Sequence, residues 1–170
     1  MLFRSKNYPV VEQIYTGPQG FFVPKTFGSA ISGRLGLQAV AELGFIVVMV
    51  DGRGTTGRSR AFHEYSYRNL GGVFDDHVAL IRQMGARYPY MDLNRVGIYG
   101  TSAGGYGSAH AMLVHPEFYK VCVSISGDHD ARLDKAWWNE LYQGYPMGED
   151  YVAQSNMSLA DRLQIGRAHV

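Results

Sequence analysis

Residues 95–106, RVGIYGTSAGGY, decide the fold of this chain. Residues 96–99 have the apolar pattern of a short strand, a glycine-rich turn surrounds Ser102, and an alanine-rich helical pattern follows. A strand, a sharp turn with a serine at its apex and a helix are the three parts of a nucleophile elbow. In so tight a turn, side chains at Gly100 and Gly104 would collide with the neighbouring strand and helix. The pattern predicts that Ser102 is a nucleophile, and a serine that merely caps the helix is the alternative.

Composition excludes several classes of protein. The chain has 170 residues, of which 46% are hydrophobic and 18% charged, as is ordinary for one globular domain. Sixteen basic and 15 acidic residues give a net charge of +1 without a basic cluster, so no nucleic-acid partner is predicted. The longest apolar run, residues 45–50, is far shorter than the ~20 residues of a transmembrane helix. The first residues lack the apolar core of a signal peptide, and nothing indicates a compartment.

Strand and helix patterns alternate along the chain. Residues 45–50 are apolar without alternation, which is typical of a strand covered on both faces of a parallel sheet, and residues 119–126 are expected to form another fully buried strand. Residues 89–95 are expected to form a turn. The expected strands are 8–15, 45–50, 96–99 and 119–126, and the expected helices are 31–43, 73–87 and the one after the elbow. The sequence therefore predicts an α/β protein with a mostly parallel sheet and helices on both faces.

Ligands of such sheets bind beyond the carboxyl ends of the strands. Four loops are candidate walls of a site there, at residues 16–20, 51–54, 101–105 and 127–130. A serine nucleophile also needs a base, and His129, between Asp128 and Asp130, is the most tempting of six histidines. His129 follows the first strand after the elbow, and proteins with a nucleophile elbow carry neither the catalytic acid nor the catalytic base at that position. His129 is therefore expected to be a pocket wall or a group that stabilises its loop. No second histidine has ligand spacing, and neither a metal nor a cofactor is predicted.

Four segments together resemble the catalytic domain of the prolyl oligopeptidase family of serine peptidases. They are IYTGPQG (14–20), VVMVDGRG (47–54), RVGIYGTSAGGYGS (95–108) and WWNELYQG (137–144). The resemblance covers nearly all of residues 8–163 and is nearest to the dipeptidyl peptidase branch. It implies the α/β-hydrolase fold.

The resemblance also implies roles for individual residues. The tyrosine of the Tyr-x-Gly-Pro segment, here Tyr15, donates its hydroxyl to the oxyanion hole, and the backbone N–H of Ala103 is the second donor. By itself, Tyr15 would be interpreted as an aromatic residue at a strand end. Asp51 and Arg53 match a loop with a structural pairing role.

The aromatic segment falls where the branch lines its proline-accepting pocket. Trp138 is the expected pocket residue, with Trp137 and Tyr142 beside it, because proline stacks on aromatic faces. The alternative is an amphipathic helix that buries its tryptophans. This sequence differs from the dipeptidyl peptidase pattern at two places that affect which substrate residue is accepted at the cleavage site. Ala103 stands where dipeptidyl peptidases often carry tyrosine, and Asp128 and His129 follow the strand end.

The expected function is hydrolysis of oligopeptides through an acyl-enzyme on Ser102, in dipeptidyl or prolyl oligopeptidase fashion, after proline, alanine or another small residue. An esterase or acyl-peptide hydrolase on the same fold and a non-catalytic scaffold member are the alternatives. The resemblance further implies an N-terminal β-propeller domain and homodimer formation in the full-length protein.

The end of the sequence suggests a fragment. Residues 1–164 are expected to be a partial α/β-hydrolase domain, incomplete at the C-terminus and inactive by itself, because the family's catalytic aspartate and histidine would lie further on. Residues 165–170, IGRAHV, lack strand character and resemble a translated sequencing adapter. A native polar tail is the alternative. His169 is not favoured as a base, since no acid-bearing strand precedes it.

Overall fold

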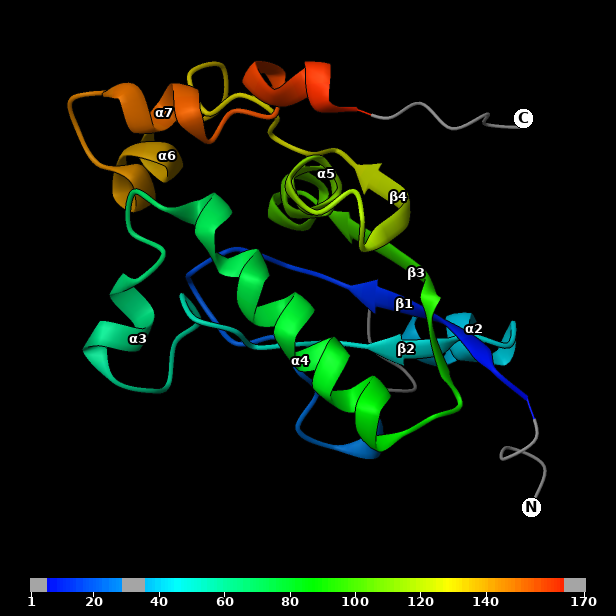
Figure 1. Cartoon of the computed structure of the whole chain (residues 1–170). Helices are drawn as coiled ribbons and strands as arrows, with labels where there is room; N and C mark the ends of the chain where they lie inside the picture. Colours follow the sequence, from blue (N-terminus) through cyan, green and yellow to red (C-terminus); the bar gives the residue numbers. More distant parts are fainter. Residues whose placement is uncertain (1–5, 29–35, 164–170) are drawn as a thin grey trace.

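The computed structural model describes residues 6–28 and 36–163, which form a parallel four-stranded sheet with helices around it (Figure 1). The strand order is β2-β1-β3-β4. The strands are β1 (Tyr8–Gln13), β2 (Ile46–Val48), β3 (Met91–Thr101) and β4 (Tyr119–Ile125). The α-helices are α2 (Leu37–Glu42), α3 (Arg60–Glu64), α4 (Phe74–Arg87), α5 (Ala103–Val114), α6 (Ala136–Gln143) and α7 (Glu149–Ala153), and the 3-10 helices are η1 (Leu70–Val73) and η2 (Met157–Arg162). This architecture confirms the predicted α/β class.

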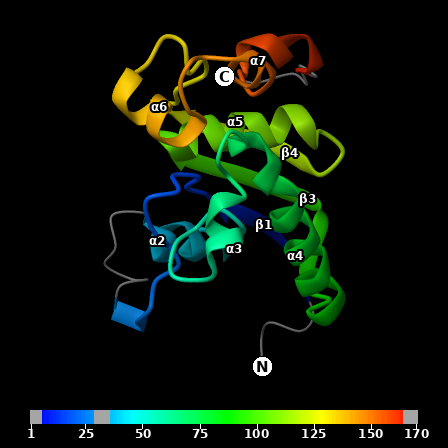
Figure 2. The same ribbon diagram turned by 90° about the vertical axis from the view of Figure 1, so that its left-hand side faces the viewer.

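Helices lie on both sides of the sheet. Figure 2 shows β1 between α2 on one side and α4 on the other. Helix α5 lies on the same side as α4, and the two helices meet where Phe74 stacks on His110 with ring centroids 5.5 Å apart. The hydrophobic core fills the space between these helices and the sheet. Its buried members include Val10, Ile14, Phe74, Val78, Ile81, Val96, Ile98, Ala111 and Phe118.

Most predicted elements are present, with shifted boundaries. Strand β3 begins at Met91, so the expected turn at 89–95 is wrong over most of its length. The pairing register with β1 jumps after Pro9, which pairs with Asp92 while Val10 pairs with Val96, and residues 93–95 bulge out of the ladder. Of the predicted helix 31–43, α2 is the described part, and Gly44 follows it with a φ of +98°.

The predicted burial of two strands is wrong for the described residues. Strands β2 and β4 form the two edges of the sheet, and β2 is only half-buried. On β4, Val121, Val123 and Ile125 are 61%, 50% and 46% exposed. Side chains alternate along a strand, so these three residues share the face opposite α5, where no described element covers them. An apolar run therefore did not distinguish a central strand from an edge strand.

Further sequence predictions concern membrane spans and chain segments that the structure does not describe. None of the described helices is long and apolar enough to cross a membrane. The expected tail at 165–170 and the start of the predicted helix at 31–35 lie outside the described residues.

Three glycines bring the elbow into backbone contact with both neighbouring strands. A Cβ atom on Gly104 would lie 2.2 Å from the carbonyl oxygen of Ile14, at the end of β1. One on Gly100 would lie 2.3 Å from the Gly104 carbonyl oxygen, and one on Gly105 would lie 2.5 Å from that of Ile125. Any side chain at these positions would push the start of α5 away from the sheet.

A buried polar network lies between the sheet and α4. The carboxylate of Glu12, fully buried on β1, accepts hydrogen bonds from His77 Nδ1 at 2.5 Å and from the Tyr119 hydroxyl at 2.6 Å. The network joins β1, α4 and β4 through one side chain. Buried charges persist only where such partners satisfy them, so the network fixes how these three elements are arranged.

We expect Gly104→Ala to destabilise the domain by more than about 3 kcal/mol, because the colliding atoms are backbone and cannot turn aside. Gly97→Ala, on strand β3 before the elbow, is the matched control, since its Cβ would meet the Val121 carbonyl oxygen at an ordinary 3.5 Å. Urea unfolding of the full-length protein checks both variants. Equal midpoints for the two would contradict the argument.

Tyr119→Phe should lower the free energy of unfolding by about 1–3 kcal/mol, because it leaves one buried Glu12 oxygen without a donor. Tyr145→Phe removes the same hydroxyl from a side chain that is 74% exposed and serves as the control. The urea midpoint is the measurement. If both variants unfold at the wild-type midpoint, the network does not contribute to stability.

Candidate active site

Ser102 sits alone between β3 and α5 in a strained conformation. Its φ and ψ are +60° and −121°, a region that residues with a side chain rarely adopt. Its backbone N–H donates to the Ile125 carbonyl oxygen at 2.9 Å, and its carbonyl oxygen accepts from Tyr106 N at 3.0 Å. These two backbone hydrogen bonds stabilise the strained backbone conformation of Ser102. The exposed hydroxyl is thereby presented at the N-terminus of a twelve-residue helix, whose dipole favours negative charge.

Tyr15 follows the end of β1 and faces the same space as Ser102. The adjacent Thr16 donates from its hydroxyl to the Ala103 carbonyl oxygen at 2.6 Å, which ties this loop to the first turn of α5. The Tyr15 ring packs against Phe22 with centroids 4.5 Å apart, and its hydroxyl accepts from Gln19 Nε2 at 3.2 Å. The hydroxyl is therefore positioned by contacts on both sides.

A cavity of about 360 Å³ opens beside the elbow and is called the main cavity because most of the predicted site residues line it. Its lining is mainly apolar, with a few polar groups, as is usual for a site that binds a small ligand. Of the residues singled out from the sequence, Tyr15, Ser102, Ala103, Asp128, Trp137, Trp138 and Tyr142 line it. The structure therefore brings together residues that lie far apart in the sequence.

Helix α6 forms one wall of this cavity. Trp138 and Tyr142 are half-buried and pack edge to face, with ring centroids 4.8 Å apart. The helix does not bury its tryptophans as the alternative expected, because Trp137 is 68% exposed. The residues it does bury are two amides, Asn139 and Gln143, which also line the cavity. Their spacing of four residues puts them on one face of the helix. This spacing could have predicted a polar buried face from the sequence, whereas the prediction from the sequence concerned only the aromatic residues of the segment.

His129 stabilises its loop and makes no hydrogen bond to Ser102. Its Nδ1 accepts from Asn156 Nδ2 at 3.0 Å, and its Nε2 lies 3.3 Å from the Ser124 hydroxyl. This pattern requires the proton on Nε2. The His129 backbone oxygen accepts from Ser155 Oγ at 3.1 Å. The residue lines a second cavity, of about 380 Å³, which also reaches Ser102.

Asn156 is a site residue that sequence reasoning missed. Besides holding His129, its Oδ1 lies 2.7 Å from Nδ1 of His110 on α5. Burial lowers the pKa of His110, which keeps the imidazole neutral in this contact. Asn156 thus connects the loop after β4 to the helix that begins at Ser102. No local pattern in the sequence marks this residue, because its partners lie 27 and 46 positions away.

Asp128 contributes a carboxylate to both cavities. Burial raises the pKa of this half-buried group, and the negative charge of Asp134 raises it further, while contact with the Asn139 amide opposes the shift. The pKa of Tyr106, at the cavity wall, is raised first by burial and then by the Asp128 charge. The cavity wall thus holds a partly desolvated carboxylate whose charge also affects Tyr106.

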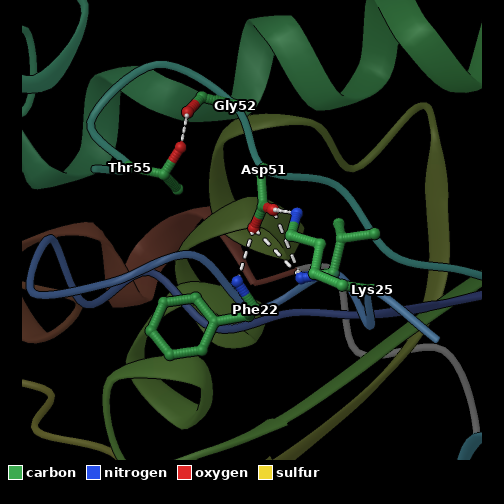
Figure 3. A network of polar contacts seen from close by, with 6 residues as sticks. Phe22, Lys25, Asp51, Gly52 and Thr55 are labelled. Atoms are coloured by element: carbon green, nitrogen blue, oxygen red, sulfur yellow. Dashed lines mark hydrogen bonds and ion pairs between the residues drawn. The ribbon is translucent and has the colours of Figure 1, made fainter. Parts of the chain in front are cut away.

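The loop after β2 is built by pairing, as expected for Asp51 and Arg53. Asp51 accepts from the backbone N–H groups of Phe22 and Val23 at 2.7 Å and 3.2 Å (Figure 3). Arg53 forms two hydrogen bonds of 2.6 Å with Asp76 on α4. The ion pair raises the pKa of Arg53 and lowers that of Asp76. These contacts hold the loops behind Tyr15 and touch no part of the main cavity.

Comparison with known proteins agrees with this geometry. Residues 32–169 match the model of the prolyl oligopeptidase family. Dipeptidyl peptidase 8 of Homo sapiens is 33% identical over 143 residues, which are 84% of this chain and 16% of that protein. The crystal structure of Porphyromonas gingivalis dipeptidyl peptidase 4 superposes with a TM-score of 0.81 at 28% identity, covering 95% of this chain and 22% of that one.

A more distant structure shares the fold alone. Acylaminoacyl peptidase of Pyrococcus horikoshii has a TM-score of 0.78 at 23% identity and covers 93% of this chain and 26% of its own. This chain thus spans only a small share of the length of each relative it matches. The family match, the parallel sheet and the strained serine at the strand-to-helix turn agree: the chain belongs to the prolyl oligopeptidase family of serine peptidases and has its α/β-hydrolase fold.

Proposed function

We propose that this chain carries the nucleophile, the oxyanion hole and part of the substrate pocket of a serine peptidase that cleaves oligopeptides. The observation that supports this most directly is that Tyr15, Ser102 and Ala103 line one cavity at the carboxyl ends of the parallel strands. The family consists of serine peptidases, and the homologues imply peptide substrates.

In this proposal the Ser102 oxygen attacks the carbonyl carbon of the scissile peptide bond. The carbonyl oxygen becomes an oxyanion, which the Tyr15 hydroxyl and the Ala103 backbone N–H stabilise. The amine leaves, and water then hydrolyses the acyl-enzyme. The donors come from loops after different strands, and the Thr16–Ala103 hydrogen bond of 2.6 Å holds those loops together.

The serine proton requires a base. No described histidine or carboxylate forms a hydrogen bond with the Ser102 side chain, and the proposal assigns the base and its orienting acid to groups outside the described range. A preceding β-propeller domain, a homodimer and release of dipeptides belong to the same proposal. The relatives named dipeptidyl peptidases are much longer than this chain, which leaves room for a further domain, and their name supports dipeptide release.

Ser102→Ala should abolish labelling of the full-length protein by a fluorophosphonate probe, since the probe reacts with an activated serine oxygen. Ser158→Ala, which changes an exposed serine on η2, is the control and should label as the wild type does. Labelling that persists in Ser102→Ala would overturn the assignment. An unlabelled wild type would favour the non-catalytic alternative.

Tyr15→Phe should lower kcat by ~10²–10³-fold and leave KM nearly unchanged, because the oxyanion it meets develops only in the transition state. Tyr67→Phe, which removes a hydroxyl from an exposed tyrosine outside the main cavity, is the matched control. Steady-state kinetics on chromogenic peptides gives both constants. A change confined to KM would assign Tyr15 to substrate binding instead.

A further inference from the structure

The main cavity holds an acidic group close to the nucleophile. Asp128 lies three residues after Ile125, whose carbonyl oxygen accepts the backbone N–H of Ser102 at 2.9 Å. Both Asp128 and Ser102 line the main cavity and the second cavity. A substrate acylating Ser102 would therefore have its cleaved residue beside this carboxylate.

The neighbouring acidic residues are paired, whereas Asp128 is not. Asp130 accepts from Arg132 Nε at 2.7 Å, and Asp134 pairs with Lys135 Nζ at 3.0 Å. Among the described residues, Asp128 forms no ion pair. Its half-buried carboxylate contacts the Asn139 side chain and the Asp130 backbone, and the charges near it, those of Asp134 and Asp130, are negative. Burying a charge without a counter-charge is unfavourable, so a cation entering the cavity would be stabilised there.

Two amide oxygens in the same cavity also lack donors. Asn139 and Gln143 are 1% and 3% exposed, and neither Asn139 Oδ1 nor Gln143 Oε1 has a hydrogen-bond partner among the described residues. The Asn139 amide nitrogen is already engaged by the Ala131 carbonyl oxygen at 2.9 Å. Buried acceptors are generally satisfied in proteins, so donor groups of a ligand in this cavity would find two acceptors that no described residue occupies.

We propose, on the basis of the peptidase function above, that the main cavity accepts a cationic side chain, lysine or arginine, at the cleaved residue of the substrate. The Asp128 carboxylate neutralises its charge, and the amide oxygens of Asn139 and Gln143 accept hydrogen bonds from its ammonium or guanidinium group. Trp138 and Tyr142 pack against its aliphatic stem.

This assignment differs from the cleavage after proline or a small residue that the sequence resemblance implied. A proline ring would fill part of the cavity but would leave the two amide oxygens unpaired and the Asp128 carboxylate without a counter-charge. A site built from buried polar groups discriminates strongly against a substrate that lacks the matching donors.

The test uses the full-length protein and chromogenic peptides that differ only in lysine, arginine, alanine or proline at the cleaved residue. Each peptide is made with a free and a blocked amino terminus. We expect wild-type kcat/KM to be at least ~10-fold higher for lysine and arginine than for alanine, and Asp128→Asn to lower that ratio at least ~10-fold. Gln143→Leu, a second variant, should lower the same ratio. Asp161→Asn makes the same charge change at an exposed residue of η2 and should not move it.

Fluorophosphonate labelling of Ser102 reports folding of each variant. Ser102-dependent cleavage that prefers proline or alanine, or a ratio unchanged in Asp128→Asn, would overturn this inference and leave the peptidase function standing. An Asp128→Asn effect that follows the free amino terminus instead of the cleaved residue would also overturn it, because the carboxylate would then recognise the terminal ammonium. If no peptide is cleaved in a Ser102-dependent way, the proposed function fails, and this inference with it.

Discussion

Close backbone contact at the start of α5 is the constraint on which the rest of the site depends. At Gly104 the helix comes so near to Ile14 that a Cβ atom would lie 2.2 Å from its carbonyl oxygen, and Gly105 approaches Ile125 almost as closely. Because the helix touches β1 and β4 at once, the residue before it has little conformational choice. Ser102 accordingly adopts a φ of +60°, which would relax if the helix could move outward.

The same contact aligns groups that the chain supplies from separate places. Tyr15 directly follows the Ile14 carbonyl, and Asp128 follows the loop that Gly105 touches, so the glycines set the positions of both relative to Ser102. Side-chain hydrogen bonds then position each loop. In the loop after β1, Thr16 donates to the Ala103 carbonyl oxygen, and in the loop after β4, His129 accepts from Asn156. The positions of oxyanion donors matter to within a fraction of an ångström, and rigid backbone contact supplies that precision better than flexible side chains do.

The sequence predicts those parts of the fold that local patterns encode. The elbow and α4 are recognisable because glycine sterics and helical periodicity act over a few residues. The exposure of Val121 on β4 could not be inferred, since it depends on which elements lie next to a strand. Nor could the role of Asn156, whose partners are distant in the chain. Within α6 the sequence pattern predicted aromatic pocket residues, whereas the buried residues of the helix are Asn139 and Gln143.

In the proposed function, chemistry and recognition belong to different parts of this fold. Ser102, Ala103 and Tyr15 lie where β3, α5 and β1 meet, and close backbone contacts together with the Thr16–Ala103 hydrogen bond set their positions. Asp128 and the cavity face of α6 come from the segment after β4. Its backbone packs against the elbow at Gly127, where a Cβ atom would lie 2.7 Å from the Gly105 carbonyl carbon, and hydrogen bonds such as that between Asn156 and His129 hold the part that follows. Side chains beyond Gly127 can therefore differ in charge and size without altering the backbone contacts around Ser102. This separation would permit the residue that the cavity accepts to change while the reaction at Ser102 stays the same.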